Sequence, residues 1–67
     1  MYVKTDYDGC PYITAGKAYD VYHVSPMGFH WIMSDWNEKF PLKPNIPCAV
    51  FDGKGTWTIC DNKGNKL

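Results

Sequence analysis

The sequence predicts an all-β domain, a small and partly open barrel of about five to six short antiparallel strands. Glycine, proline and Asp-Gly turn formers interrupt the chain so evenly that no stretch is long enough for a convincing helix. The runs between them are rich in the β-branched and aromatic residues that suit a pleated, half-buried surface. With 67 residues there is room for one domain, residues 1–67. A sheet this small protects its edges best by curling.

The first strand is expected near residues 2–5, followed by a long loop. Residues 17–24 then form a second strand, in which side chains alternate between two faces. Asp20 lies on one of these faces, so Tyr19 and Val21 on the other face are the expected core pair.

After a Ser-Pro-Met-Gly turn, residues 29–33 form the next strand and pair with residues 17–24 as a hairpin. Phe29, Trp31 and Met33 alternate along this strand, and the periodicity predicts that they face the core.

The following strand, residues 39–42, must be short or lie at an edge, because Pro41 cannot donate a hydrogen bond to a central ladder. Phe40 is expected to join the core. Residues 43–47 hold too much proline for a strand and predict an irregular connection.

Residues 48–51 and 56–60 are predicted to form a tight hairpin, because the Asp-Gly sequence between them favours such a turn. The polar tail, residues 61–67, is expected to fray. The core residues predicted from this part of the chain are Phe51, Trp57 and Ile59.

Residues 13–21 read Ile-Thr-Ala-Gly-Lys-Ala-Tyr-Asp-Val, and a strand follows at residues 29–33. This stretch resembles the (I/L)-T-x-G-K-x-Y-x-V opening of small SH3-like barrel proteins of bacteriophage and prophage origin. The resemblance implies an SH3-like, partly open barrel in which Tyr19 and Val21 fill the interior. It also implies a phage or prophage accessory protein, and it implies no particular activity.

The charge balance argues against nucleic acid as the main partner. Seven lysines balance seven acidic residues, and the chain has no arginine, the residue that reads phosphate and guanine bidentately. Single-stranded nucleic acid remains an alternative, since small barrels bind it with stacked aromatics and lysine contacts. Its stacking platforms would be Trp36 or Tyr22, and its cationic contacts would be Lys4, Lys17, Lys39, Lys43 and Lys54.

The cysteines predict neither a disulfide framework nor a metal site. Cys10, Cys48 and Cys60 show no CxxC spacing, and their odd number leaves at least one thiol unpaired. They also stand too far apart in sequence to form a zinc knuckle with His23 or His30. We therefore expect reduced thiols, no metal and no cofactor. The expected location is the cytoplasm, of a bacterial host cell if the protein is phage-encoded.

No enzymatic activity is expected. Nucleophilic catalysis by a cysteine needs a histidine in contact and a third group that orients it. A domain this small should also lack the cleft of roughly 300 Å³ or more that substrates need. A proline-peptide groove is not expected either, because Trp31 stands alone where peptide-binding SH3 domains carry tandem tryptophans. No stretch approaches the roughly 20 apolar residues of a membrane span.

Trp36 is the leading candidate for partner binding, because the strand pattern stops at Asp35 and the neighbouring residues are polar. It either binds a partner, as exposed tryptophans often do, or folds back to cap the barrel. The candidate partner-binding residues are Trp36, Asn37, Tyr7, Tyr12 and Tyr22. The sequence thus predicts a non-enzymatic module that binds a bacterial host protein; the alternatives are nucleic-acid binding and self-association into a structural component.

Overall fold

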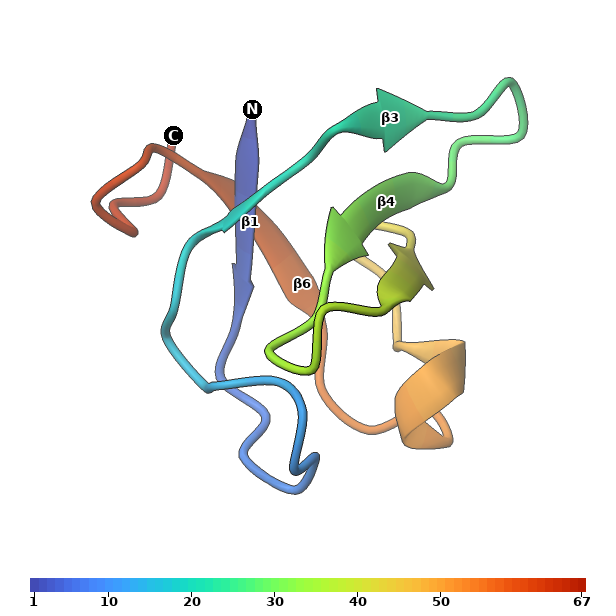
Figure 1. Ribbon diagram of the computed structural model, residues 1–67, viewed down its shortest axis with the longest axis vertical. Helices are drawn as coiled ribbons and strands as arrows, with labels where there is room; N and C mark the ends of the chain where they lie inside the picture. The colour runs from blue at the N-terminus through green and yellow to red at the C-terminus, as the bar shows by residue number, and fades with distance from the viewer.

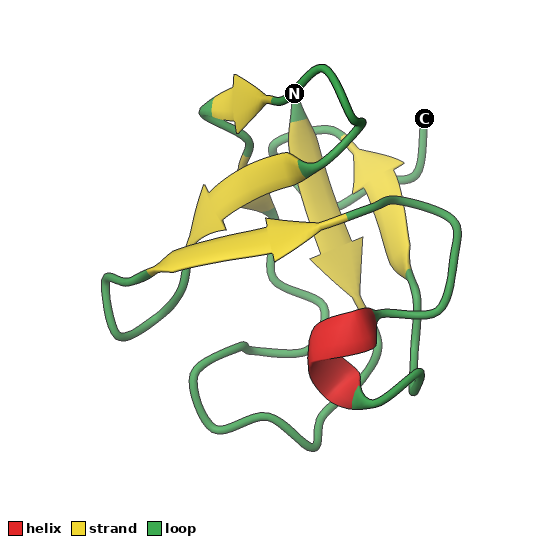
Figure 2. Cartoon of the chain, turned by 90° about the vertical axis from the view of Figure 1, so that its right-hand side faces the viewer, coloured by secondary structure: helices red, strands yellow, loops and turns green.

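The computed structural model describes residues 1–67 and confirms the all-β class. Six short strands form two three-stranded antiparallel sheets, with strand orders β2-β1-β6 and β3-β4-β5. Figures 1 and 2 show the two sheets crossing, and no strand pairing closes them into a barrel. No helix is long and apolar enough to cross a membrane. The strands are β1 (Tyr2–Thr5), β2 (Tyr19–Asp20), β3 (His23–Val24), β4 (His30–Met33), β5 (Lys39–Leu42) and β6 (Trp57–Cys60).

The strand expected at residues 17–24 divides into β2 and β3, which belong to different sheets. The Val21 N–H donates to the Met1 carbonyl at 2.9 Å, and the next N–H, of Tyr22, donates to the Trp31 carbonyl at 3.0 Å. One bent segment therefore supplies a strand to each sheet. The predicted hairpin with the following strand exists only as the β3–β4 pair.

The core lies between the two sheets and is built around Trp57, whose side chain is fully buried. The Trp57 ring meets the rings of Tyr19, Phe40 and Phe51 at centroid distances of 6.0, 5.7 and 6.1 Å. These four were predicted core residues and are confirmed, whereas Val21 and Ile59 are only half-buried against the cluster. The buried cluster is Val3, Ile13, Tyr19, Ile32, Phe40, Leu42, Cys48, Phe51 and Trp57.

The predicted core face of β4 is wrong. Ile32 is fully buried, Met33 is 40% exposed, and Phe29 and Trp31 are half-buried. The pairing with β5 sets Ile32 opposite the buried Phe40, and a shift of one residue in a strand exchanges its two faces. Phe29, Trp31 and Met33 therefore belong to the outer side of the sheet.

Residues 48–51, expected as a strand, form a 3-10 helix, η1 (Ala49–Phe51), drawn in red in Figure 2. Strand pairing before β6 is limited to one bridge, between Pro47 and Thr56. A helical turn points Cys48 and Phe51, which are three positions apart, into the core together, whereas an extended strand would separate them. Val50 is left 45% exposed as a result.

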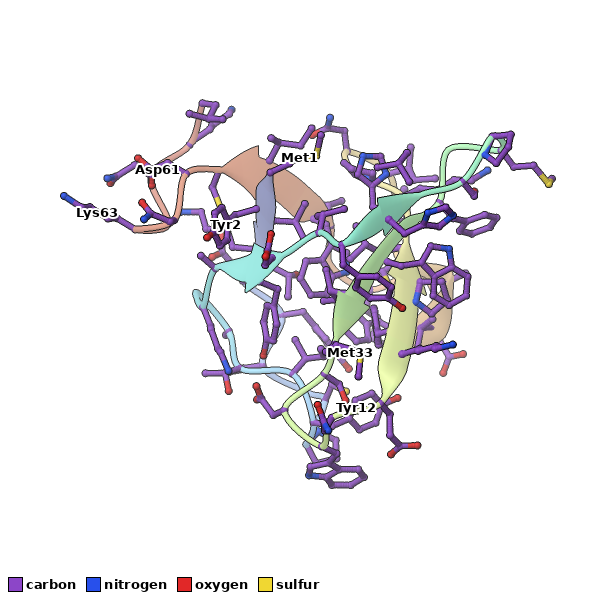
Figure 3. The ribbon with its side chains drawn as sticks, turned by 45° about the horizontal axis from the view of Figure 1, so that its top comes forward. Met1, Tyr2, Tyr12, Met33, Asp61 and Lys63 are labelled. Atoms are coloured by element: carbon purple, nitrogen blue, oxygen red, sulfur yellow. The ribbon has the colours of Figure 1, made fainter.

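The tail, expected to fray, folds into a turn beside β6. One carboxylate oxygen of Asp61 accepts the N–H groups of Lys63 and Asn65, both at 2.9 Å. Lys66 then forms a bridge to Cys60, so the chain returns to the end of β6 after the turn, which projects beyond that strand in Figure 3. The side chain of Asp61 thus supplies the backbone partners that the tail would otherwise lack.

Candidate interaction surface

Asp35 fastens the long loop between β1 and β2 to the turn between β4 and β5. Its side chain accepts hydrogen bonds from Lys17 Nζ at 2.7 Å, from the Tyr19 hydroxyl at 2.9 Å and from Thr14 Oγ1 at 2.5 Å. Its own N–H donates to the Tyr12 carbonyl at 2.9 Å. Two segments distant in sequence are therefore held side by side, and each carries an aromatic residue.

The Lys17 ammonium and the Thr14 hydroxyl, which both donate to Asp35, hold the pKa of that carboxyl below its ordinary value. A carboxyl whose pKa is lower in the folded state stabilises the fold above its unfolded-state pKa. That contribution is lost as the pH falls through the folded-state pKa.

Asp35→Asn is expected to lower the free energy of unfolding by about 1–2 kcal/mol at neutral pH, because it removes the charge from three hydrogen bonds. Urea unfolding should also show a weaker fall in stability below about pH 5 than in the unmodified protein. Asp8→Asn is the matched control, since Asp8 is an exposed carboxylate of the same long loop and forms no ion pair. Equal pH profiles for Asp35→Asn and the unmodified protein would show that Asp35 does not carry this effect.

Trp36 is 59% exposed and rests on Tyr12, with ring centroids 5.1 Å apart. Tyr12 in turn lies edge-on to the core residue Phe40 at 6.2 Å. A hydrogen bond with the Cys10 side chain raises the pKa of Tyr12. Tyr12, labelled beside the β4–β5 turn in Figure 3, therefore connects Trp36 to the core. One side of the Trp36 indole is supported and much of the remainder faces solvent.

Asn37 shapes the turn that presents Trp36. It has a left-handed backbone conformation, with φ of 59°, which asparagine adopts more readily than most residues. The buried Ser34 closes the turn, because its hydroxyl accepts the N–H groups of Trp36 and Glu38, both at 3.3 Å. Asn37 thus has a structural role beside Trp36, whatever it contacts in a partner.

Tyr7 lies further along the same side of the molecule and packs on Phe51, with ring centroids 4.6 Å apart. A Cβ atom at Gly55 would stand 2.7 Å from the Tyr7 Cβ, and one at Gly9 would stand 2.3 Å from its hydroxyl oxygen. Glycine at these two positions makes room for the ring. The half-buried Tyr7 therefore attaches the loop to η1.

Tyr22 lies elsewhere and is 50% exposed. It lines a separate groove with Met33 and Lys39. Of the predicted partner-binding residues, the structure places Trp36, Asn37, Tyr12 and Tyr7 along one side and leaves Tyr22 apart.

Val50 is the surface residue that the sequence interpretation missed. It lines three neighbouring grooves, of about 280, 410 and 240 Å³. Tyr12 and Trp36 border the first of these, and Ile46, 47% exposed, borders the second. Residues 48–51 were expected in a strand, where Val50 would share a face with Cys48. We call this the Val50 surface, made of Tyr12, Trp36, Pro41, Ile46 and Val50.

The grooves are larger than expected for so small a domain, since the widest has a volume of about 530 Å³. They arise because the two sheets are not closed on each other and the 3-10 helix stands beside them. Five grooves of about 240 to 530 Å³ have no histidine in their linings. Burial raises the pKa of the Cys60 thiol, which disfavours the nucleophilic thiolate. The fold brings together no three metal-binding side chains.

The chain matches no family model, no curated protein and no solved structure.

Proposed function

We propose that this chain is a non-enzymatic protein-binding module that contacts its partner through the Val50 surface. The observation that carries the proposal is the exposed Trp36 indole, which is supported from one side and borders a run of grooves that polar and apolar side chains line together. Tryptophan is enriched at interface hot spots, and continuous exposed apolar patches mark interaction sites.

The way Trp36 is held favours binding over chance exposure. Its turn is closed by Ser34, and the adjoining Asp35 accepts three side-chain hydrogen bonds, two from the long loop and one from Tyr19 of β2. An indole fixed before binding loses little conformational entropy when a partner arrives. The surface is therefore suited to a partner that packs against the rigidly held indole of Trp36.

The partner class follows from the resemblance of residues 13–21 to small SH3-like proteins of phages and prophages. On that basis the partner is a bacterial host protein, met in the host cytoplasm, and the chain is an accessory protein. Association with a second copy of the chain is the main alternative for this surface.

Trp36→Ala is expected to weaken partner binding by about 2 kcal/mol or more, roughly 30-fold, while leaving the fold intact. The measurement is affinity capture from nuclease-treated bacterial lysate, followed by calorimetric titration of the retained protein with each variant. Tyr22→Ala is the matched control, because it removes an aromatic ring of similar exposure from another groove.

Three outcomes would count against the proposal. Equal loss of affinity in Trp36→Ala and Tyr22→Ala would remove the Val50 surface as the binding site. Unfolding of Trp36→Ala, seen by circular dichroism, would make the indole a structural cap. Capture that occurs only from a parallel lysate without nuclease would show that nucleic acid bridges the two proteins.

A further inference from the structure

The outer side of the β3-β4-β5 sheet presents a row of large side chains away from the core. The strand register sets His23, Trp31 and Pro41 side by side across the three strands. The same register sets Met33 opposite Lys39 at one end of β4, where Figure 3 labels Met33. At the other end, Lys43 Nζ lies 4.7 Å from the centre of the Phe29 ring. We call this the outer face, made of His23, Phe29, Trp31, Met33, Lys39, Pro41 and Lys43.

The outer face has a local positive charge that the neutral whole-chain total conceals. Neither residues 21–34 nor residues 39–51 contain a single Asp or Glu, so all three strands of this sheet lack carboxylates. Lys39 and Lys43 form no ion pair, since the molecule's salt bridge joins Lys17 to Asp35, although Glu38 lines a groove with Lys39. The two ammonium groups are therefore available to an anion.

Each end of the outer face opens into a groove that combines an aromatic residue with a lysine. Phe29 and Lys43 border a groove of about 410 Å³, and Tyr22 and Lys39 border one of about 530 Å³. The carboxylate residue Asp20 also lines the second groove. Trp31 lies between the Phe29–Lys43 pair and the Tyr22–Lys39 pair.

We propose that the outer face binds single-stranded nucleic acid. Bases stack on Trp31 and on the rings of Phe29 and Tyr22, and phosphates meet Lys39 and Lys43. Stacking on exposed aromatics beside a cationic track is how small barrels hold single strands. Phe29 and Trp31, two positions apart along an extended chain, lie about 7 Å from one another, which allows successive bases to use separate rings.

The chemistry of the face favours this occupant over a second copy of the chain. In a two-fold dimer the same patch meets itself, so Lys39 and Lys43 of both copies would enter one interface to which the three strands supply no carboxylate. Binding should depend little on base sequence, because the chain has no arginine to read base edges bidentately. This inference does not rest on the protein-binding role of the Val50 surface, although the two surfaces share Pro41 and the groove that Phe29 and Lys43 line with Ile46 and Val50.

The test is fluorescence anisotropy of a labelled oligothymidylate of about 12 nucleotides, titrated with protein at low ionic strength. Lys39→Glu/Lys43→Glu is expected to raise Kd at least about tenfold. The matched control is Lys63→Glu/Lys66→Glu, which makes the same change in net charge on the C-terminal turn and should raise Kd by less than about threefold. Unmodified protein should also bind more weakly as salt rises, with a slope of about −0.7 per phosphate contacted.

A second pair of variants tests stacking. Trp31→Leu should raise Kd at least about fivefold, while Tyr2→Leu, which removes a half-buried aromatic ring from β1 in the other sheet, should leave it unchanged. If Trp31→Leu fails to fold, the lysine pairs still decide the question.

No anisotropy change at low salt would overturn the proposal. So would equal weakening by the two lysine pairs, which would show attraction to net charge alone. Sedimentation that shows a dimer lost in Lys39→Glu/Lys43→Glu would assign the outer face to a second copy instead.

Discussion

Trp57→Ala is expected to leave most of the protein unfolded at 25 °C. Replacing a buried tryptophan by alanine costs about 3–5 kcal/mol, and a core in a chain of this size rarely supplies more than that. Trp57 is fully buried and touches the rings of Tyr19, Phe40 and Phe51, which come from three other parts of the chain. The loss should appear as a collapsed near-ultraviolet circular dichroism signal and the absence of a cooperative urea transition.

Trp57→Phe is the control that separates ring packing from indole chemistry. The indole Nε1 of Trp57 is buried and has no hydrogen-bond partner, so phenylalanine removes an unsatisfied donor while it leaves a smaller cavity. This variant should therefore stay folded, with a loss of about 1–2 kcal/mol. A cooperative transition for Trp57→Ala close to that of the unmodified protein would contradict the central position of this ring.

Ile32→Ala is expected to lower the free energy of unfolding by about 2–5 kcal/mol, whereas Met33→Ala should lower it by less than about 1 kcal/mol. The two residues are neighbours in β4, but Ile32 is fully buried and Met33 is 40% exposed. Chemical denaturation of both variants measures which face of β4 supports the core.

This pair also decides between the two interpretations of β4. If the face containing Phe29, Trp31 and Met33 were the core, as the alternation suggested, Met33→Ala would be the costlier change. Ile32→Val serves as a control for β4, because it removes one methyl group and should cost about 0.5–1.5 kcal/mol.

The candidate site was predicted in part. Trp36 was singled out because polar residues interrupt the strand pattern around it, and the structure places its indole at the surface beside Tyr12. Sequence reasoning did not predict Val50, since its exposure depends on the 3-10 helix. It also did not predict the Asp35 contacts, which join residues 18 and 21 positions apart in sequence.

The sequence by itself determined the all-β class, the regions of most strands and the burial of Tyr19, Phe40, Phe51 and Trp57. These follow from turn formers, residue type and local alternation, which are properties of short segments.

The tertiary structure alone decided which face of β4 is the core, where residues 17–24 bend between the sheets and how residues 48–51 turn into a helix. Along β4, local alternation favours the face with Phe29, Trp31 and Met33, because Ile32 is the one large apolar residue on the other face, and this choice is wrong. The choice is made by pairing with β5, which sets Ile32 beside Phe40 and turns Trp31 and Met33 toward solvent, because a one-residue change of register exchanges every side chain of a strand.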